Sequence, residues 1–199
     1  GTISTAPTAP GHLLEWLHVD AEMDFVVSEL TGESLSEICR QSDLCDPRIV
    51  VINSLANSRS VSGMRSGLTA SSFDDFLATL PRDGRVVLNG DDGQLRRVVG
   101  RTSDQVLWVG RNPDADLVAS HVAWSDGQLS FTVENTRVQV PVWGRHYLSA
   151  ALAAFAVGRL LDLPAVEIAL ALSEMRDTPE RAEVIRTGGF AVVRDSAPG

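Results

Sequence analysis

Lysine is absent from this sequence. Its 199 residues contain 17 basic side chains, all of them arginine, against 26 aspartate and glutamate residues, which gives a formal net charge of −9 at pH 7. The chain therefore cannot itself supply a Walker-type phosphate-binding lysine, a Schiff-base lysine, a carbamylated lysine or a lysine general base. The acidic balance also disfavours partners bound through phosphate neutralisation. We expect neither a nucleic acid nor a membrane as a partner.

Cysteines and long apolar runs are scarce as well. Cys39 and Cys45 are too few for a disulfide framework and have no metal-ligand partners nearby, so we expect two reduced thiols. The longest apolar stretch, 147–163, is interrupted by Arg159 and Asp162 and is shorter than the roughly 20 residues of a membrane span. The sequence shows no secretory signal. Together these features predict a cytoplasmic protein.

The apolar patterns predict an α/β fold, with a mostly parallel sheet flanked by helices. Apolar runs bounded by polar residues predict buried strands, at 24–30, 48–53, 85–88 and within 102–110. Helical periodicity predicts helices between and after them, the clearest from Ser71, where Phe73, Phe76, Leu77 and Leu80 share one face. Other helices are expected at 13–19, 35–39, 94–99, 145–161 and 164–175.

Alternating strands are appended to this parallel sheet. The segments 117–124, 128–133 and 137–142 predict an antiparallel β meander, with a hairpin turn at Asp126-Gly127. A second hairpin is expected at 182–193 around Gly188-Gly189. Since no repeat or low-complexity linker divides the chain, we expect one domain over 1–199, with 117–142 as its antiparallel insert.

Three local patterns could carry chemistry. The segment Asn89-Gly90-Asp91-Asp92 follows a predicted strand directly, where open α/β sheets place ligand-binding loops. Glu29 at another strand end could hold Mg²⁺, and Gly144-Arg145-His146 opens the longest helix, whose N-terminal amides favour an anion. Each pattern also has a simpler explanation when it is taken singly. The segment 89–92 could be a solvated turn, Glu29 a surface carboxylate and 144–146 an ordinary helix start.

In order along the chain, these patterns resemble the central, ATP-binding domain of the Mur ligase superfamily, which adds amino acids to the UDP-linked muramic acid precursor of peptidoglycan. The phrase Asp83–Asp92 is the most specific match. The other segments similar to family motifs are Gly1–Pro10, VVSELTGESL from Val26, Ile52-Asn53, Gly144–Tyr147 with Ala153-Ala154, Glu180-Arg181 and Asp195-Ser196-Ala197.

The resemblance implies ATP and Mg²⁺ as cofactors. It assigns nucleotide contacts to Asn89, Asp91, Asp92, His146, Arg181 and Asp195, and a metal contact to Glu29. It also implies that His146, Asn89 and Asp195 lie near one another at the carboxyl edge of the parallel sheet. Other domains of a larger ligase-like protein are the implied partners, and the oligomeric state is left open.

The departures from the family pattern concern its catalytic groups. The Asp-His of the family's metal loop corresponds to Asn57-Ser58, and the lysine that the family carbamylates corresponds to Ser72. The family's P-loop and its C-terminal domain are expected to be absent from this chain. We therefore expect weak or no ATP binding and no catalytic residue.

Three hypotheses for the function follow from the sequence. The first is a degenerate, non-catalytic Mur-ligase-like central domain, a pseudoenzyme with an interaction, scaffold or weak nucleotide-binding role. The second is a fragment of an active, ATP-dependent amino-acid ligase of peptidoglycan synthesis. The third is an unrelated α/β module that binds a small ligand.

Overall fold

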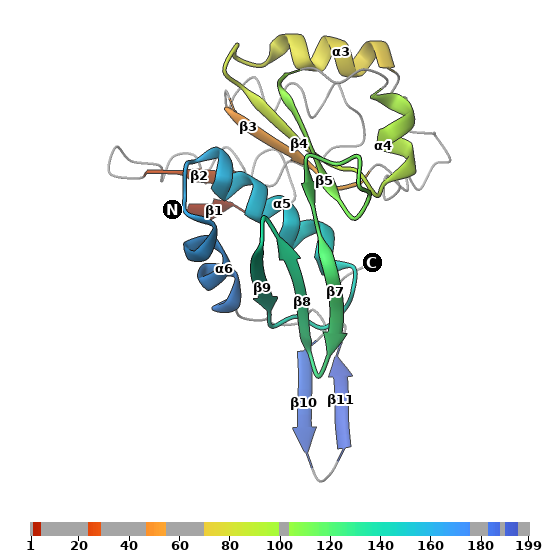
Figure 1. Ribbon diagram of the computed structural model, residues 1–199, viewed down its shortest axis with the longest axis vertical. Helices are drawn as coiled ribbons and strands as arrows, with labels where there is room; N and C mark the ends of the chain where they lie inside the picture. Colours follow the sequence, from red (N-terminus) through yellow and green to blue (C-terminus); the bar gives the residue numbers. More distant parts are fainter. Residues whose placement is uncertain are drawn as a thin grey trace.

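The computed structural model describes residues 2–4, 24–28, 47–54, 70–99, 104–175, 183–187 and 190–194 (Figure 1). Its helices are α3 (Ala70–Thr79), α4 (Gly93–Val98), α5 (Tyr147–Leu160) and α6 (Ala165–Ser173). Its strands are β1 (Thr2–Ser4), β2 (Val26–Ser28), β3 (Ile49–Ile52), β4 (Arg85–Asn89), β5 (Val106–Gly110), β6 (Leu117–Val118), β7 (Ser120–Ser125), β8 (Gln128–Val133), β9 (Thr136–Val140), β10 (Glu183–Thr187) and β11 (Phe190–Arg194).

A parallel sheet of order β3-β4-β5-β6 forms the centre of the fold. Each neighbouring pair runs parallel, and the register pairs Val87 of β4 with Val51 of β3 and with Leu107 of β5. Helices α3 and α4 supply connections between its strands, as the sequence predicts for a parallel sheet. The predicted α/β fold class is confirmed.

The sheet is buried on both faces because successive side chains of a strand point to opposite sides. On one face, Val86 and Leu88 of β4 pack with Phe73 and Phe76 of α3. On the other face, Val87 joins a larger cluster with α5, α6 and the antiparallel strands. A strand covered on both faces reads as a continuous apolar run, as β4 does.

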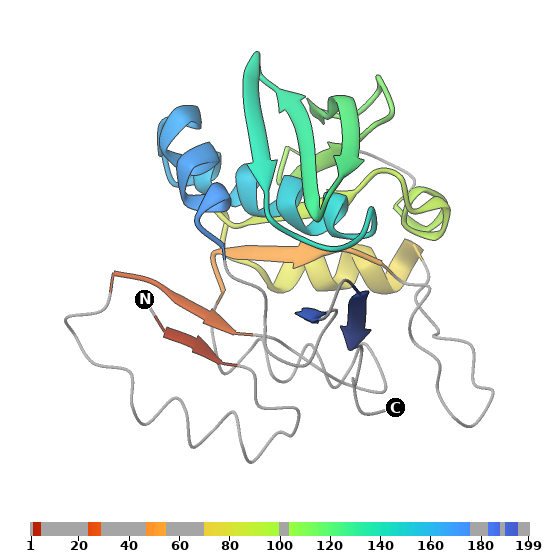
Figure 2. The same cartoon turned by 90° about the horizontal axis from the view of Figure 1, so that it is seen from below.

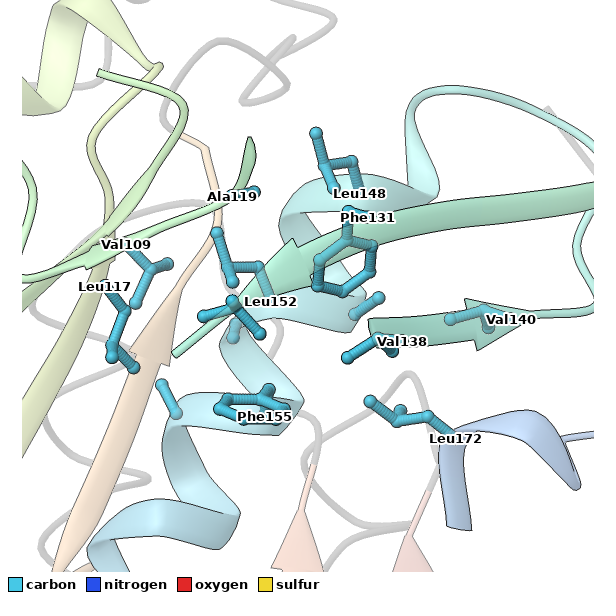
Figure 3. Packing of buried hydrophobic residues seen from close by; sticks show 14 of the residues in the cluster. Val109, Leu117, Ala119, Phe131, Val138, Val140, Leu148, Leu152, Phe155 and Leu172 are labelled. Atoms are coloured by element: carbon cyan, nitrogen blue, oxygen red, sulfur yellow. The ribbon is translucent and has the colours of Figure 1, made fainter. Parts of the chain in front are cut away.

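Figure 3 shows the larger cluster, in which Leu152 and Phe155 of α5 lie between the parallel sheet and Phe131 of β8. Helix α5 packs against β4 and β5 and also against α6. The strands β7-β8-β9 form a separate antiparallel sheet, which confirms the predicted meander. The long helix thus joins the two sheets through a shared core.

One predicted strand is in fact two. The run 117–124 was expected to be a single strand of the meander, but Leu117 and Val118 pair in parallel with β5 as β6, and β7 starts only at Ser120. Between them, the Ala119 amide donates to the carbonyl of Gly110. Alternating apolar residues fit either sheet, so the pattern could not reveal the change of partner.

The expected burial of the strand at 24–30 is wrong. Strand β2 is three residues long, with Phe25 52% and Val27 59% exposed. Within the described residues β2 pairs only with β1, in parallel, which leaves these two side chains in contact with solvent. Strand β3 is half-buried, and Val51 on it is exposed.

The C-terminal hairpin of β10 and β11 is antiparallel, as predicted (Figures 1 and 2). The turn Gly188-Gly189 and the predicted helices at 13–19 and 35–39 lie outside the described residues. In the part of the chain that the structure describes, no helix is both long and apolar enough to cross a membrane.

Candidate functional site

Asn89 is the last residue of β4 and links this strand to the end of β3. Its Nδ2 donates to the carbonyl of Asn53 at 2.9 Å, and its Oδ1 accepts from the amide of Asp91 at 3.0 Å. The second bond is an Asx turn, the local hydrogen bond that makes asparagine common in turns. Both ends of the amide are therefore used within the chain.

Asp91 and Asp92 also bind their own chain. Both carboxylate oxygens of Asp91 accept from the amide of Arg111, at 2.9 and 3.1 Å. Asp92 caps α4, because its Oδ1 accepts from the amides of Gln94 and Leu95 at 2.8 and 3.0 Å. Its Oδ2 accepts from the hydroxyl of Ser54 at 2.7 Å.

Arg96 of α4 also contacts the turn at 89–92. Its Nε donates to the carbonyl of Gly90 at 3.1 Å, and its guanidinium carbon lies 4.5 Å from the centroid of the Trp108 ring. A Cβ atom added at Gly90 would lie 2.9 Å from Nη2 of Arg96, so a larger residue there would displace the guanidinium. Among the described residues of this edge, three buried polar atoms have no hydrogen-bond partner, namely Nη2 of Arg96, Nε1 of Trp108 and Oδ1 of Asn53.

His146 stands at the start of α5 as its N-cap residue and makes no side-chain capping bond. Its ring centroid lies 4.4 Å from that of Tyr147, and the ring covers Gly144 so closely that an added Cβ atom would overlap with it. Gly144 has a φ of +140°, which favours glycine. His146 and Arg145 are both exposed.

The helix start and the strand ends lie on one side of the molecule. In Figures 1 and 2, α5 begins on the side toward which β3 points. This is the carboxyl edge of the parallel sheet, where the resemblance implies a nucleotide. Of the other predicted contacts, Glu29, Arg181 and Asp195 lie outside the described residues, as do Asn57 and Ser58.

The described residues do not assemble a metal site. Among them, no group of three or more histidine, cysteine, aspartate or glutamate side chains could hold a metal ion. The nearest carboxylates on the carboxyl edge, Asp91 and Asp92, already accept hydrogen bonds from amides or a hydroxyl. The predicted metal contact, Glu29, is not among these residues, so a metal site at this edge stays a prediction.

The family described as Mur ligase middle domain matches residues 1–158 of this sequence. The chain belongs to the Mur ligase family. This match covers the parallel sheet, the meander and nearly all of α5, and it confirms the resemblance seen in the sequence. It also excludes the third hypothesis, an unrelated α/β module.

The curated relatives that match are UDP-N-acetylmuramate–L-alanine ligases. The chain is 32% identical over 160 residues to the UDP-N-acetylmuramate–L-alanine ligase of Chlorobaculum tepidum, covering 76% of this chain and 33% of that protein. For the ligase of the same name from Laribacter hongkongensis, the identity is 30% over 185 residues, covering 86% and 39%. The chain thus spans between a third and two fifths of the length of these two relatives.

Solved structures of the family share the fold. MurF from Acinetobacter baumannii superposes with a TM-score of 0.81 at 18% identity, over 97% of this chain and 43% of that one. MurF from Thermotoga maritima in complex with ADP gives 0.76 at 19% identity, over 98% and 46%. At these identities the likeness concerns the fold alone.

Sequence reasoning missed three residues that shape this edge, namely Ser54, Arg96 and Arg111. Ser54 and Arg96 each bind the Asn89–Asp92 segment through a side chain, whereas Arg111 does so through its backbone amide. The only available signal was position, because Ser54 follows a predicted strand and Arg96 lies one helical turn after Asp92.

Proposed function

We propose that this chain is a Mur-ligase-like middle domain that does not catalyse ligation, and that it serves an interaction or scaffold role with at most weak nucleotide binding. The observation that carries the proposal is helix α3, Ala70–Thr79, which lies between β3 and β4 in chain order and contains no lysine. In the family pattern a helix at this place carries the lysine that is carbamylated.

Phosphoryl transfer to a carboxylate depends on positioning and charge neutralisation by metal ions and fixed donors. The 17 arginines of this chain cannot form a carbamate ligand, since that chemistry needs a neutral amine. Replacing even one charge-stabilising group typically costs about 10²–10³ in rate. Asn57-Ser58 in place of Asp-His removes an imidazole ligand as well.

The geometry at the carboxyl edge supports the same conclusion. The side chains at this edge already form hydrogen bonds within the chain. Asn89 donates to the carbonyl of Asn53, Asp91 accepts from the amide of Arg111, and Asp92 accepts from the hydroxyl of Ser54. His146 and Tyr147 form a partly exposed pair of rings at the start of α5, tilted by 36° with their centroids 4.4 Å apart, on which a nucleotide base could stack weakly.

Calorimetry with Mg·ATP on the 199-residue chain tests the proposal. We expect no tight, Mg²⁺-dependent heat of binding; such binding would contradict a degenerate site. The ligase of Chlorobaculum tepidum, a similar protein, is the positive control.

A second candidate is the middle domain of an active ligase, favoured by the 32% identity to a UDP-N-acetylmuramate–L-alanine ligase. The two candidates differ in turnover by the complete gene product that contains this chain. If the protein does not catalyse ligation, adding UDP-N-acetylmuramate and L-alanine should not increase the release of phosphate from ATP. The positive control is the same assay on the Chlorobaculum tepidum ligase, which should release phosphate under these conditions.

A further inference from the structure

We propose that the Asn89–Asp92 segment is a clasp that fixes the ends of β3, β4 and β5 relative to one another. In this assignment Asn89, Asp91 and Asp92 are positioning residues, and their polar groups bind backbone groups of the chain and the hydroxyl of Ser54. The proposal does not rest on the proposed function, because it holds whether or not the protein turns over ATP.

The clasp reaches β3 at the point where backbone pairing stops. The parallel ladder of β3 and β4 ends at the pair Ile52 and Leu88. One residue further on, the side chain of Asn89 donates to the carbonyl of Asn53 at 2.9 Å. Ser54 then donates to Asp92 at 2.7 Å. These two side-chain hydrogen bonds thus extend the contact between β3 and β4 beyond the last backbone pair.

The clasp reaches β5 in the same way. The ladder of β4 and β5 ends at Asn89 and Val109, and the Gly90 amide donates to the carbonyl of Val109 at 2.7 Å. Beyond it, the Asp91 carboxylate accepts from the Arg111 amide. A Cβ atom at Gly110 would lie 2.8 Å from Oδ1 of Asp91, so glycine leaves the space that this carboxylate occupies.

Helix α4 is the third element that contacts the clasp, after β3 and β5. Asp92 caps the helix, and from within the helix Arg96 returns to donate to the carbonyl of Gly90 at 3.1 Å. Arg96 is itself held over the ring of Trp108, a residue of β5 that is 3% exposed. The segment is therefore tied to α4 and to the sheet at once.

This arrangement has a consequence for any site at the carboxyl edge. In open α/β sheets, ligands bind in the crevice outside the carboxyl ends of the strands. A clasp that fixes the ends of neighbouring strands also fixes where the connections after β3 and β5 start. Asn89 and Asp91 would thus influence such a site by positioning the chain segments that follow β3 and β5, without contacting the ligand.

Amide hydrogen exchange, followed by NMR on the full chain, tests the clasp. The variant Asp91→Asn keeps the size of the side chain but weakens the charge-assisted bond, so exchange of the Arg111 amide should accelerate by about tenfold. Asn89→Ala should do the same for the Asp91 amide. The matched control is Asp75→Asn on the exposed surface of α3.

The pattern of exchange separates a clasp from general destabilisation. Amides in the β7-β8-β9 sheet should exchange in Asp91→Asn as they do in the control. Exchange at Arg111 and Asp91 within about twofold of the control would overturn the proposal.

A titration with millimolar Mg·ADP supplies the second test. The side-chain amide resonances of Asn89 should stay unchanged, whereas a saturable shift that is lost in Asp91→Asn would show ligand contact and overturn the clasp. Turnover by the complete gene product would contradict the proposed function and leave the clasp standing, so the two failures can be distinguished.

Discussion

The guanidinium carbon of Arg96 lies 4.5 Å from the centroid of the Trp108 ring, and the Nε of the same side chain donates to the carbonyl of Gly90. The planar guanidinium can stack on an indole and donate a directed hydrogen bond at the same time. A lysine ammonium is a compact point charge and reproduces this arrangement poorly. This pair connects the apolar core beneath α3 and α4 to the turn at the carboxyl edge.

Replacing Arg96 by alanine should therefore destabilise the fold. We expect a loss of about 1–2 kcal/mol, because a cation–π contact and a hydrogen bond are removed together. Equilibrium unfolding in urea measures this loss. The matched control is Arg97→Ala, since Arg97 is the exposed neighbour in α4 and should cost no more than about 0.5 kcal/mol. Equal losses for the two variants would contradict a role for the Trp108 stack.

Two glycines with different surroundings give the next prediction. Gly127 has a φ of +76°, and a Cβ atom added there would lie 2.6 Å from the Trp143 ring. Gly127→Ala should therefore cost about 1–3 kcal/mol, from backbone strain and overlap with the ring.

Gly93→Ala is the control for this prediction. Gly93 is the first residue of α4, and an added Cβ there meets nothing within 4 Å. Alanine should be neutral or stabilising by up to about 1 kcal/mol, because it restricts the unfolded chain. Thermal unfolding of both variants checks the contrast, and a larger loss for Gly93→Ala would reverse the interpretation.

The shared core predicts a large effect at Phe155. This side chain is fully buried between the two sheets, so Phe155→Ala should lower the free energy of unfolding by about 3–5 kcal/mol. The parallel and the antiparallel sheet should still unfold together, in one transition. Val166→Ala on the exposed side of α6 should change the free energy of unfolding by no more than about 0.5 kcal/mol. A loss no larger than that of Val166→Ala would contradict a shared core built on Phe155.

Much of the fold could be predicted because local patterns and burial agree. Phe73, Phe76 and Leu80 are spaced as one helical face, and all three are buried, the first two within α3 and Leu80 directly after it. The division at Ala119 could not be predicted, because alternation fixes which side of a strand is apolar but not which strand it pairs with. Likewise, the apolar residues Phe25 and Val27 predicted burial, but burial depends on covering elements that the local pattern does not specify.

The candidate site was predictable in position but not in its contacts. Turn chemistry after a strand located the Asn89–Asp92 segment, and the expected edge of the sheet is where it lies. Its partners Asn53 and Arg111 are 36 and 20 residues away from the side chains that they bind, and no local rule specifies such pairs. The clasp is therefore a property of the tertiary structure.

The last prediction concerns an ion pair between the end of helix α5 and the turn that joins β8 and β9. Arg159 at the end of α5 donates from Nε to Glu134 Oε2 at 2.8 Å, and both side chains are more than a third exposed, at 38% and 37%. Arg159 also donates from Nη1 to the carbonyl of Leu163 at 2.9 Å. Because solvent and salt screen an exposed pair, Glu134→Gln should cost only about 0.2–1 kcal/mol, and this loss should shrink in molar salt.

Arg159→Gln removes the bond to the Leu163 carbonyl in addition, so it should cost about 0.5–1.5 kcal/mol more than Glu134→Gln, and that excess should persist in salt. Urea unfolding of both variants at low and high sodium chloride concentration measures the two contributions. If salt removes the whole effect of Arg159→Gln, the hydrogen bond to the turn between α5 and α6 contributes nothing, and the ion pair alone accounts for the role of this arginine.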